Sequence, residues 1–170
     1  PETPLEETLQ ALVDVVKAGK ALYVGISRWP LEALRVAIPY LRERDVPLLI
    51  YQGRLNLLDR APIEEGIINE CEREGVGFIP FSPLAQGLLT DRYLHGIPAD
   101  SRMQRGKFLR QEMLTDELLA HLHELNAKAA VRGETLAEMA LAWILQHRAV
   151  TSVLIGASST AQLEKNLKCM

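Results

Sequence analysis

Small polar side chains and glycines directly follow four short apolar segments of this chain. They form the groups Ser27-Arg28, Gln52, Phe81-Ser82-Pro83-Leu84 and Gly156-Ala157-Ser158. Hydroxyls and amides donate hydrogen bonds and glycine permits close backbone approach, which suits a phosphorylated or amide-bearing ligand. Serine after a strand is also a common helix cap, so one such group alone is weak evidence. Four of them at one edge of a sheet favour a binding site.

A cationic segment adds electrostatic attraction to this pattern. Against Asp91 and Asp100, residues 91–110 carry the cations Arg92, Arg102, Arg105, Lys107 and Arg110. The segment therefore carries a local excess of positive charge within a chain of net charge −3, and arginine binds phosphate in a bidentate manner. A solvated surface loop is the alternative. Backbone N–H groups of Gly156–Ser159, just before a helix, could also bind an anion, although the Rossmann and P-loop glycine patterns are absent there.

Alternating strand and helix signals indicate the elements that position these groups. Buried apolar strands are expected at 21–26, 48–51, 76–80 and 151–155. Helices are expected from a possible Thr3 N-cap to Gly19 and over 31–41, 64–73, 116–131 and 135–147, with a last one after Ser159 that is cut off at Met170. Pro39 predicts a kink or an early end in its helix. The segment 82–114 has no clear period, which is typical of a functional loop.

The spacing of the first three strands predicts half of a (β/α)8 TIM barrel. The strands start at 21, 48 and 76, a period that fits one βα unit of a barrel of roughly 250 residues. Four parallel strands with covering helices would make the C-terminal half, so residues 1–170 are interpreted as a partial domain whose N-terminal half is missing. A complete doubly wound α/β domain is the alternative. In such folds, ligands bind at the carboxyl ends of the strands.

Composition argues against several classes of partner. The net charge gives no reason to expect nucleic acid or an anionic membrane surface. The sequence shows no apolar run of about 20 residues and no signal peptide. Cys71 and Cys169 have neither metal nor redox spacing, so the chain is expected to be cytoplasmic with free thiols. The four histidines lack ligand spacing, and no metal is expected.

Several motifs along the chain occur in the same order as in a known family. They are Gly25–Trp29, Phe81–Thr90, Gly96–Pro98 with Ser101-Arg102, and Val153–Ser158. Together they resemble the aldo-keto reductase superfamily over the whole chain, from the fourth barrel helix to the eighth. Within it, the resemblance is closest to bacterial L-glyceraldehyde 3-phosphate reductases and potassium-channel β subunits.

The resemblance implies a set of residues that bind NADP(H). Ser27, Arg28 and Gln52 would lie at the nicotinamide end, where Phe81 would stack on the ring. Ser82, Pro83, Leu84 and Gln86 would line the pyrophosphate path, and Arg92 and Arg102 would belong to the loop that closes over it. Gly156, Ser158, Gln162 and Asn166 would hold the adenosine half and its 2′-phosphate. Lys165 departs from the family's Glu near the adenine, and a lysine there would favour the 2′-phosphate.

The resemblance also implies what this chain lacks. The family's catalytic Tyr, Lys, Asp and His belong to the first four strands, so no catalytic residue is assigned within 1–170. The expected activity is NADP(H)-dependent reduction of small aldehydes or ketones, such as glyceraldehyde 3-phosphate or methylglyoxal, with the fragment alone inactive. The expected partners are a small carbonyl substrate, the missing half of the barrel and, in a homo-oligomer, a second copy of the chain. An NADP-binding regulatory subunit and an incomplete gene product that never folds remain alternatives.

Overall fold

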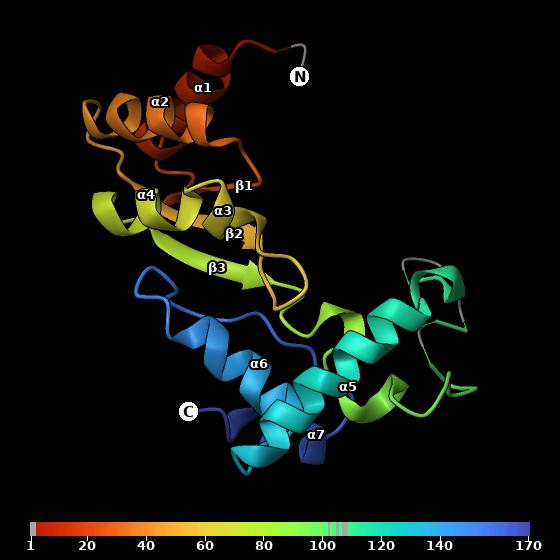
Figure 1. The fold of residues 1–170 in the computed structure, drawn as a ribbon. Coiled ribbons are helices and arrows are strands. Elements are labelled where there is room, and N and C mark those ends of the chain that lie inside the picture. Colours follow the sequence, from red (N-terminus) through yellow and green to blue (C-terminus); the bar gives the residue numbers. More distant parts are fainter. Residues whose placement is uncertain (1–2, 102, 105, 107–108) are drawn as a thin grey trace. The chain divides into compact units, whose positions relative to one another are not determined.

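The computed structural model describes residues 3–101, 103–104, 106 and 109–170. The chain divides into two compact units, which are described separately (Figure 1). Unit 1 comprises residues 1–55, 60–81 and 147–152, and unit 2 comprises residues 56–59, 82–146 and 153–170. In the described part of the chain, no helix is long and apolar enough to cross a membrane.

A parallel sheet covered by helices forms unit 1. Its strands β1 (Val24–Ser27), β2 (Leu48–Arg54) and β3 (Gly77–Phe81) lie in the order β1-β2-β3. The helices are α1 (Leu5–Lys17), α2 (Leu31–Arg42), α3 (Ala61–Glu64) and α4 (Ile67–Glu74). This alternation of strand and helix confirms the predicted α/β class and the parallel sheet.

Two details of the helices differ from the sequence prediction. Of the two outcomes predicted at Pro39, a kink or an early end, the early end is not observed: α2 continues to Arg42, and the Glu43 N–H donates to the Pro39 carbonyl at 2.9 Å. Burial of one helix face, including Leu34 and Leu41, offsets the roughly 3 kcal/mol that an internal proline costs. The helix expected at 64–73 is two helices, because Gly66 adopts a left-handed φ of +82° between them.

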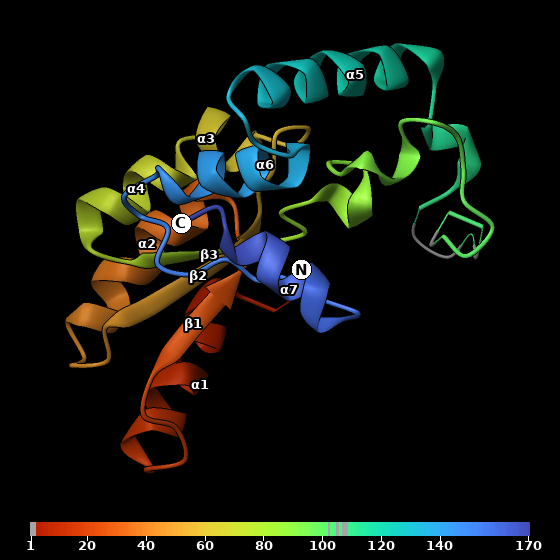
Figure 2. The same cartoon turned by 90° about the horizontal axis from the view of Figure 1, so that it is seen from below.

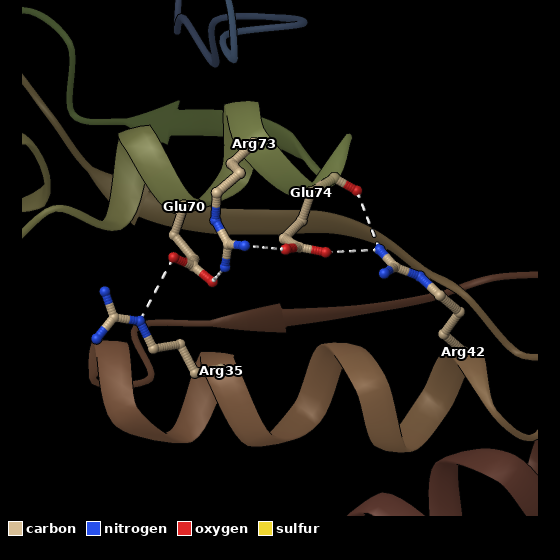
Figure 3. A network of polar contacts seen from close by, with 5 residues as sticks. All are labelled: Arg35, Arg42, Glu70, Arg73 and Glu74. Carbon is tan, nitrogen blue, oxygen red and sulfur yellow. Dashed lines mark hydrogen bonds and ion pairs between the residues drawn. The ribbon is translucent and has the colours of Figure 1, made fainter.

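Ion pairs join α2 to α4 on the outside of the sheet (Figure 3). The carboxylate of Glu70, a buried residue, accepts from Arg35 Nε at 3.4 Å and from Arg73 of its own helix. Arg42 of α2 donates to Glu74 at 2.8 Å. Charged groups alternate along this network, so each carboxylate faces a guanidinium of the neighbouring helix.

The predicted strand at 151–155 is not formed. Residue 150 makes one parallel bridge to Phe78, and the Thr151 N–H donates to the Phe78 carbonyl at 3.1 Å, but no ladder follows. The boundary between the two units falls between residues 152 and 153, inside the predicted strand. Leu154 is 45% exposed. Residues 151, 152 and 154 are exposed, and strand propensity without burial does not hold a segment in a sheet.

Apolar side chains beside and within the sheet differ widely in exposure. Leu22 is 84% exposed and Leu49 is 45% exposed, whereas Val24 is only 6% exposed. Val24 is buried because alternate residues of β1 point to opposite faces and its face is covered. Apolar residues are therefore exposed beside the sheet, at Leu22, and within it, at Leu49.

Short turns and three helices make up unit 2. The turns are η1 (Ala85–Gly87), η2 (Asp91–Tyr93) and η3 (Gln111–Met113), and the helices are α5 (Asp116–Val131), α6 (Leu136–Leu145) and α7 (Thr160–Leu167). Figure 2 shows the turn that joins α5 to α6. Thr115 caps α5, and Thr135 forms a capping box with Glu138 at the start of α6. A core around Leu89, Tyr93 and Leu122 packs the turns against these helices, so the described residues of the segment 82–114 are held by burial rather than by regular structure.

Candidate functional site

Three of the expected residues lie together at the carboxyl ends of β1 and β2. Ser27 and Gln52 are register partners in the parallel pair. The Arg28 N–H donates to the Gln52 carbonyl at 3.0 Å, and Arg28 has a left-handed φ of 58°. A non-glycine residue in that region is strained, and such strain is concentrated at functional sites. Strand pairing thus brings Ser27, Arg28 and Gln52 to one edge of the sheet.

Tyr51 faces the opposite side of β2 from Gln52, as its neighbouring position requires. Its ring is buried and stacks on Phe78 with centroids 5.6 Å apart, while its hydroxyl donates to the Trp29 carbonyl at 2.6 Å. Gly53 leaves room for this pair, since a Cβ there would lie 2.7 Å from the Phe78 ring. Burial raises the pKa of Tyr51 to about 12. This phenol therefore has a structural role and is a poor proton donor at neutral pH.

A cavity of about 740 Å³ lies within unit 2. Eight of the fourteen residues expected from the sequence line it: Ser82, Pro83, Leu84, Gln86, Arg92, Gly156, Ser158 and Gln162. They come from two segments that are far apart in the sequence. The fold brings these segments together, whereas the sequence alone linked them only through the family resemblance. Its size is within the range of small-molecule and cofactor sites.

The wall formed by residues 82–87 has a strained backbone. Ser82 has a φ of 53° and Gln86 a φ of 59°, both left-handed. Asn56, a buried side chain, holds this wall, because its Nδ2 donates to the Ser82 carbonyl at 3.0 Å. Its Oδ1 accepts from the N–H groups of Leu58 and Asp59, at 2.9 Å each. A buried amide that is hydrogen-bonded through both its nitrogen and its oxygen thus stabilises a conformation that costs of order 1–3 kcal/mol per strained residue.

The second wall is the start of α7. Ser159 caps the helix by accepting from the Gln162 N–H at 3.2 Å. The Gln162 side chain in turn accepts from the Ser158 N–H at 2.7 Å. A ligand that needs this N–H would have to displace the Gln162 carbonyl oxygen. The remaining N–H groups of the first turn and the helix dipole favour an anion here.

Arg92 brings positive charge to the cavity. Thr90 fixes the turn that carries it, because its hydroxyl accepts from the Arg92 N–H at 3.2 Å and donates to the Gly87 carbonyl at 2.6 Å. The Arg92 guanidinium pairs with the Asp100 carboxylate at 2.8 Å, and Asp100 also lines the cavity.

Three of the fourteen expected residues, Phe81, Arg102 and Asn166, are placed elsewhere or not described. Phe81 ends β3 in unit 1. Arg102 lies outside the described residues. Asn166 is buried on α7 and does not line the cavity, and among the described residues its Nδ2 has no partner. Lys165 is also not a lining residue. The pKa of Glu138 is lowered chiefly by hydrogen bonds from Thr135, and the charges of Lys168 and Lys165 contribute to this lowering.

Sequence reasoning missed several lining residues as site residues, among them Thr90, Tyr93 and Asp100. Thr90 is the last residue of the motif that starts at Phe81, so its position in the sequence offered a signal. Asp100 was counted only as an anion within a cationic segment, because nothing in the spacing showed that it returns to Arg92.

Comparison with known proteins identifies the family. The model of the aldo/keto reductase family matches residues 1–170. The chain belongs to the aldo/keto reductase family. It is 49% identical to the L-glyceraldehyde 3-phosphate reductase of Escherichia coli over 99% of the chain and 50% of that protein. It is 34% identical to a probable voltage-gated potassium channel subunit beta of Oryza sativa, again over 99% of the chain and 52% of that protein.

A solved structure supports the fold assignment. The chain matches a crystal structure of a thermostable aldo-keto reductase in complex with the inhibitor epalrestat with a TM-score of 0.69 and 27% identity, covering 99% of this chain and 50% of that one. The chain thus spans about half the length of the aldo/keto reductases it matches, and its fold is that of half of a (β/α)8 barrel. The predicted family and fold class are confirmed.

Proposed function

We propose that this chain is the cofactor-binding half of an NADP(H)-dependent aldo-keto reductase that reduces small aldehydes and ketones. The observation that carries the proposal is the cavity of unit 2, which gathers eight residues of the expected cofactor set around Arg92 and the start of α7. Strained backbone at Ser82 and Gln86 supports it, because a fold retains such strain where a ligand needs the geometry.

The donor set of this cavity fits the pyrophosphate and adenosine parts of the cofactor. Ser82, Gln86 and Arg92 would contact the pyrophosphate, and Ser158 and Gln162 the adenosine side. On unit 1, Ser27, Arg28 and Gln52 offer hydroxyl, guanidinium and amide groups for the nicotinamide carboxamide, and Phe81 a flat ring. When bound, NADPH supplies a hydride for a carbonyl carbon, while the chain orients it.

Acid–base chemistry would come from residues outside 1–170. Within the described part of the chain, two tyrosines donate hydrogen bonds: Tyr51 to the Trp29 carbonyl and Tyr40 to Gln10 at 2.9 Å. Tyr93 is 1% exposed and belongs to the core of unit 2, whereas Tyr23 is 69% exposed and does not line the cavity. We therefore assign this chain the binding role and expect its missing partner half to supply the proton.

The substrate class follows from the relatives. A reductase named for L-glyceraldehyde 3-phosphate at 49% identity favours small phosphorylated or methylglyoxal-like aldehydes. A regulatory NADP-binding role is the second candidate, favoured by the 34% identity to probable potassium channel beta subunits. Reading the sequence upstream of Pro1 for the family's Tyr, Lys, Asp and His separates the two. The two free cysteines suit a reducing compartment, so we place the protein in the cytoplasm.

The test combines binding with turnover. Calorimetric titration of the purified chain with NADP⁺ should give one site, whereas incubation with NADPH and glyceraldehyde should give no oxidation above buffer. Turnover needs delivery of a hydride and a proton together. The chain would bind the hydride donor, NADPH, but would not supply the proton donor. The full-length Escherichia coli relative serves as the positive control. Turnover by the chain itself, with contaminating reductase excluded, or no NADP⁺ binding contradicts the proposal.

A further inference from the structure

An ion pair lies within the cavity of unit 2, where an incoming anion would need the same cation. The Arg92 guanidinium contacts the Asp100 carboxylate at 2.8 Å, and both residues line the cavity. The two side chains are 44% and 79% exposed, so they are accessible to a ligand.

The backbone holds Asp100 in place for this contact. The Ser101 N–H donates to the Pro98 carbonyl at 3.0 Å, which closes a turn around Asp100. Ser101 is fully buried, and its hydroxyl accepts from the Gln104 N–H at 3.3 Å. On the other side, Thr90 fixes the backbone of Arg92. Both ends of the pair are therefore anchored, while the charged groups themselves remain at the surface of the cavity.

A guanidinium binds a carboxylate or a phosphate through the same planar N–H groups. The carboxylate of Asp100 thus presents to Arg92 the chemistry that a phosphate oxygen would present. A phosphate group at Arg92 would also lie beside a second negative charge, which repels it. Both effects weaken anion binding as long as Asp100 carries its charge.

We propose that Asp100 is an internal counterion that occupies Arg92 until a phosphate group of the dinucleotide displaces it, and that it thereby limits the cofactor affinity of this cavity. The proposal rests on the proposed function for the identity of the ligand. It assigns Asp100 an affinity-determining role, in which its removal strengthens binding. Moderate affinity allows the oxidised cofactor to leave after turnover.

The test is a double-mutant cycle on the purified 170-residue chain. NADP⁺ and inorganic pyrophosphate are titrated calorimetrically into the unmodified chain, Asp100→Asn, Arg92→Gln and the double variant. Asp91→Asn is the matched control, because it removes the same charge next to Arg92 from a residue that does not line the cavity. Thermal melting of each variant without ligand verifies that the fold is intact.

Asp100→Asn should tighten both ligands about three- to tenfold, a modest factor because water screens an exposed pair. Asp91→Asn should change affinity less than twofold, and Asp100→Asn should give no gain once Arg92 is glutamine. Unchanged or weaker binding by Asp100→Asn, or an equal gain without Arg92, overturns the counterion role. If NADP⁺ does not bind but pyrophosphate binds as described, the proposed function fails and the counterion role stands. If neither ligand binds any variant, both fail.

Discussion

Replacing Glu70 by glutamine removes the carboxylate through which α4 contacts Arg35 of α2 (Figure 3). The carboxylate is 6% exposed and accepts from Arg35 and Arg73, whereas these arginine side chains are 58% and 64% exposed. A hydrogen bond to a charged group contributes about 1.5–3 kcal/mol when both ends are shielded. Because the arginines can rehydrate, we expect Glu70→Gln to lower the free energy of unfolding of unit 1 by roughly 1–3 kcal/mol in total.

The pH dependence gives the same prediction a second readout. Burial alone would raise the pKa of Glu70, but the hydrogen bond and charge of Arg73, followed by those of Arg35, outweigh it and leave the pKa lowered. A folded-state pKa below the unfolded value of about 4.3 contributes stability that is present above that pH and lost as pH falls through the folded pKa. The difference in the free energy of unfolding between the unmodified chain and Glu70→Gln should therefore have its full size at pH 7 and shrink below about pH 4.

Urea unfolding followed by tryptophan fluorescence measures this effect. Trp29 belongs to unit 1 and Trp143 to unit 2, so a Trp143→Phe background reports on unit 1 alone. Glu43→Gln is the control, because Glu43 is 76% exposed and 3.8 Å from Arg44, and it should change the free energy by less than about 0.5 kcal/mol. A Glu70→Gln loss as small as the control, or one of equal size at pH 3 and pH 7, would refute the reasoning.

Three further predictions concern the ligand, the wall of the cavity and the assembly. In the full-length protein, NADPH should bind more tightly than NADH, and Arg102→Glu with Lys165→Glu should remove the preference; equal dissociation constants before mutation would show the cationic interpretation to be wrong. Asn56→Ala should lower the melting temperature and weaken NADP⁺ binding, since it removes the side-chain partner of the Ser82 carbonyl and of the Leu58 N–H, at about 1–3 kcal/mol each; unaltered melting contradicts this. The purified chain should self-associate at low micromolar concentration in sedimentation, because Leu22 and Leu49 are exposed beside the sheet; a compact monomer with a sharp, concentration-independent melt contradicts it.

Local patterns in the sequence were sufficient to predict the fold class and most helices. Apolar runs gave the three strands within a few residues, and capping signals at Thr115 and Thr135 marked α5 and α6 closely. The errors arose where tertiary packing competes with propensity. Pro39 is tolerated because its helix face is buried, and the segment after residue 150 lacks the pairing that would make it a strand.

The sequence predicted many of the residues that line the candidate site, but not the interactions among them. Motif order identified eight cavity-lining residues, since each motif follows a strand or precedes a helix. The Asn56 amide that supports Ser82 and the Asp100 carboxylate that meets Arg92 both depend on turns that bring separate residues together. Their side chains carry ordinary loop residue types, so no spacing rule distinguished them from solvated positions.

Hydrogen–deuterium exchange of the purified chain with and without saturating NADP⁺ tests most directly whether the cavity of unit 2 holds the cofactor. The account predicts slower exchange in the segments 82–93 and 156–163, which carry the cavity walls. The opposite ends of the strands, around Gly75 and Ala149, should exchange at the same rate in both states. Arg92→Gln should remove the protection at concentrations that saturate the unmodified chain. Saturable NADP⁺ binding without protection of these two segments would contradict the assignment of the site.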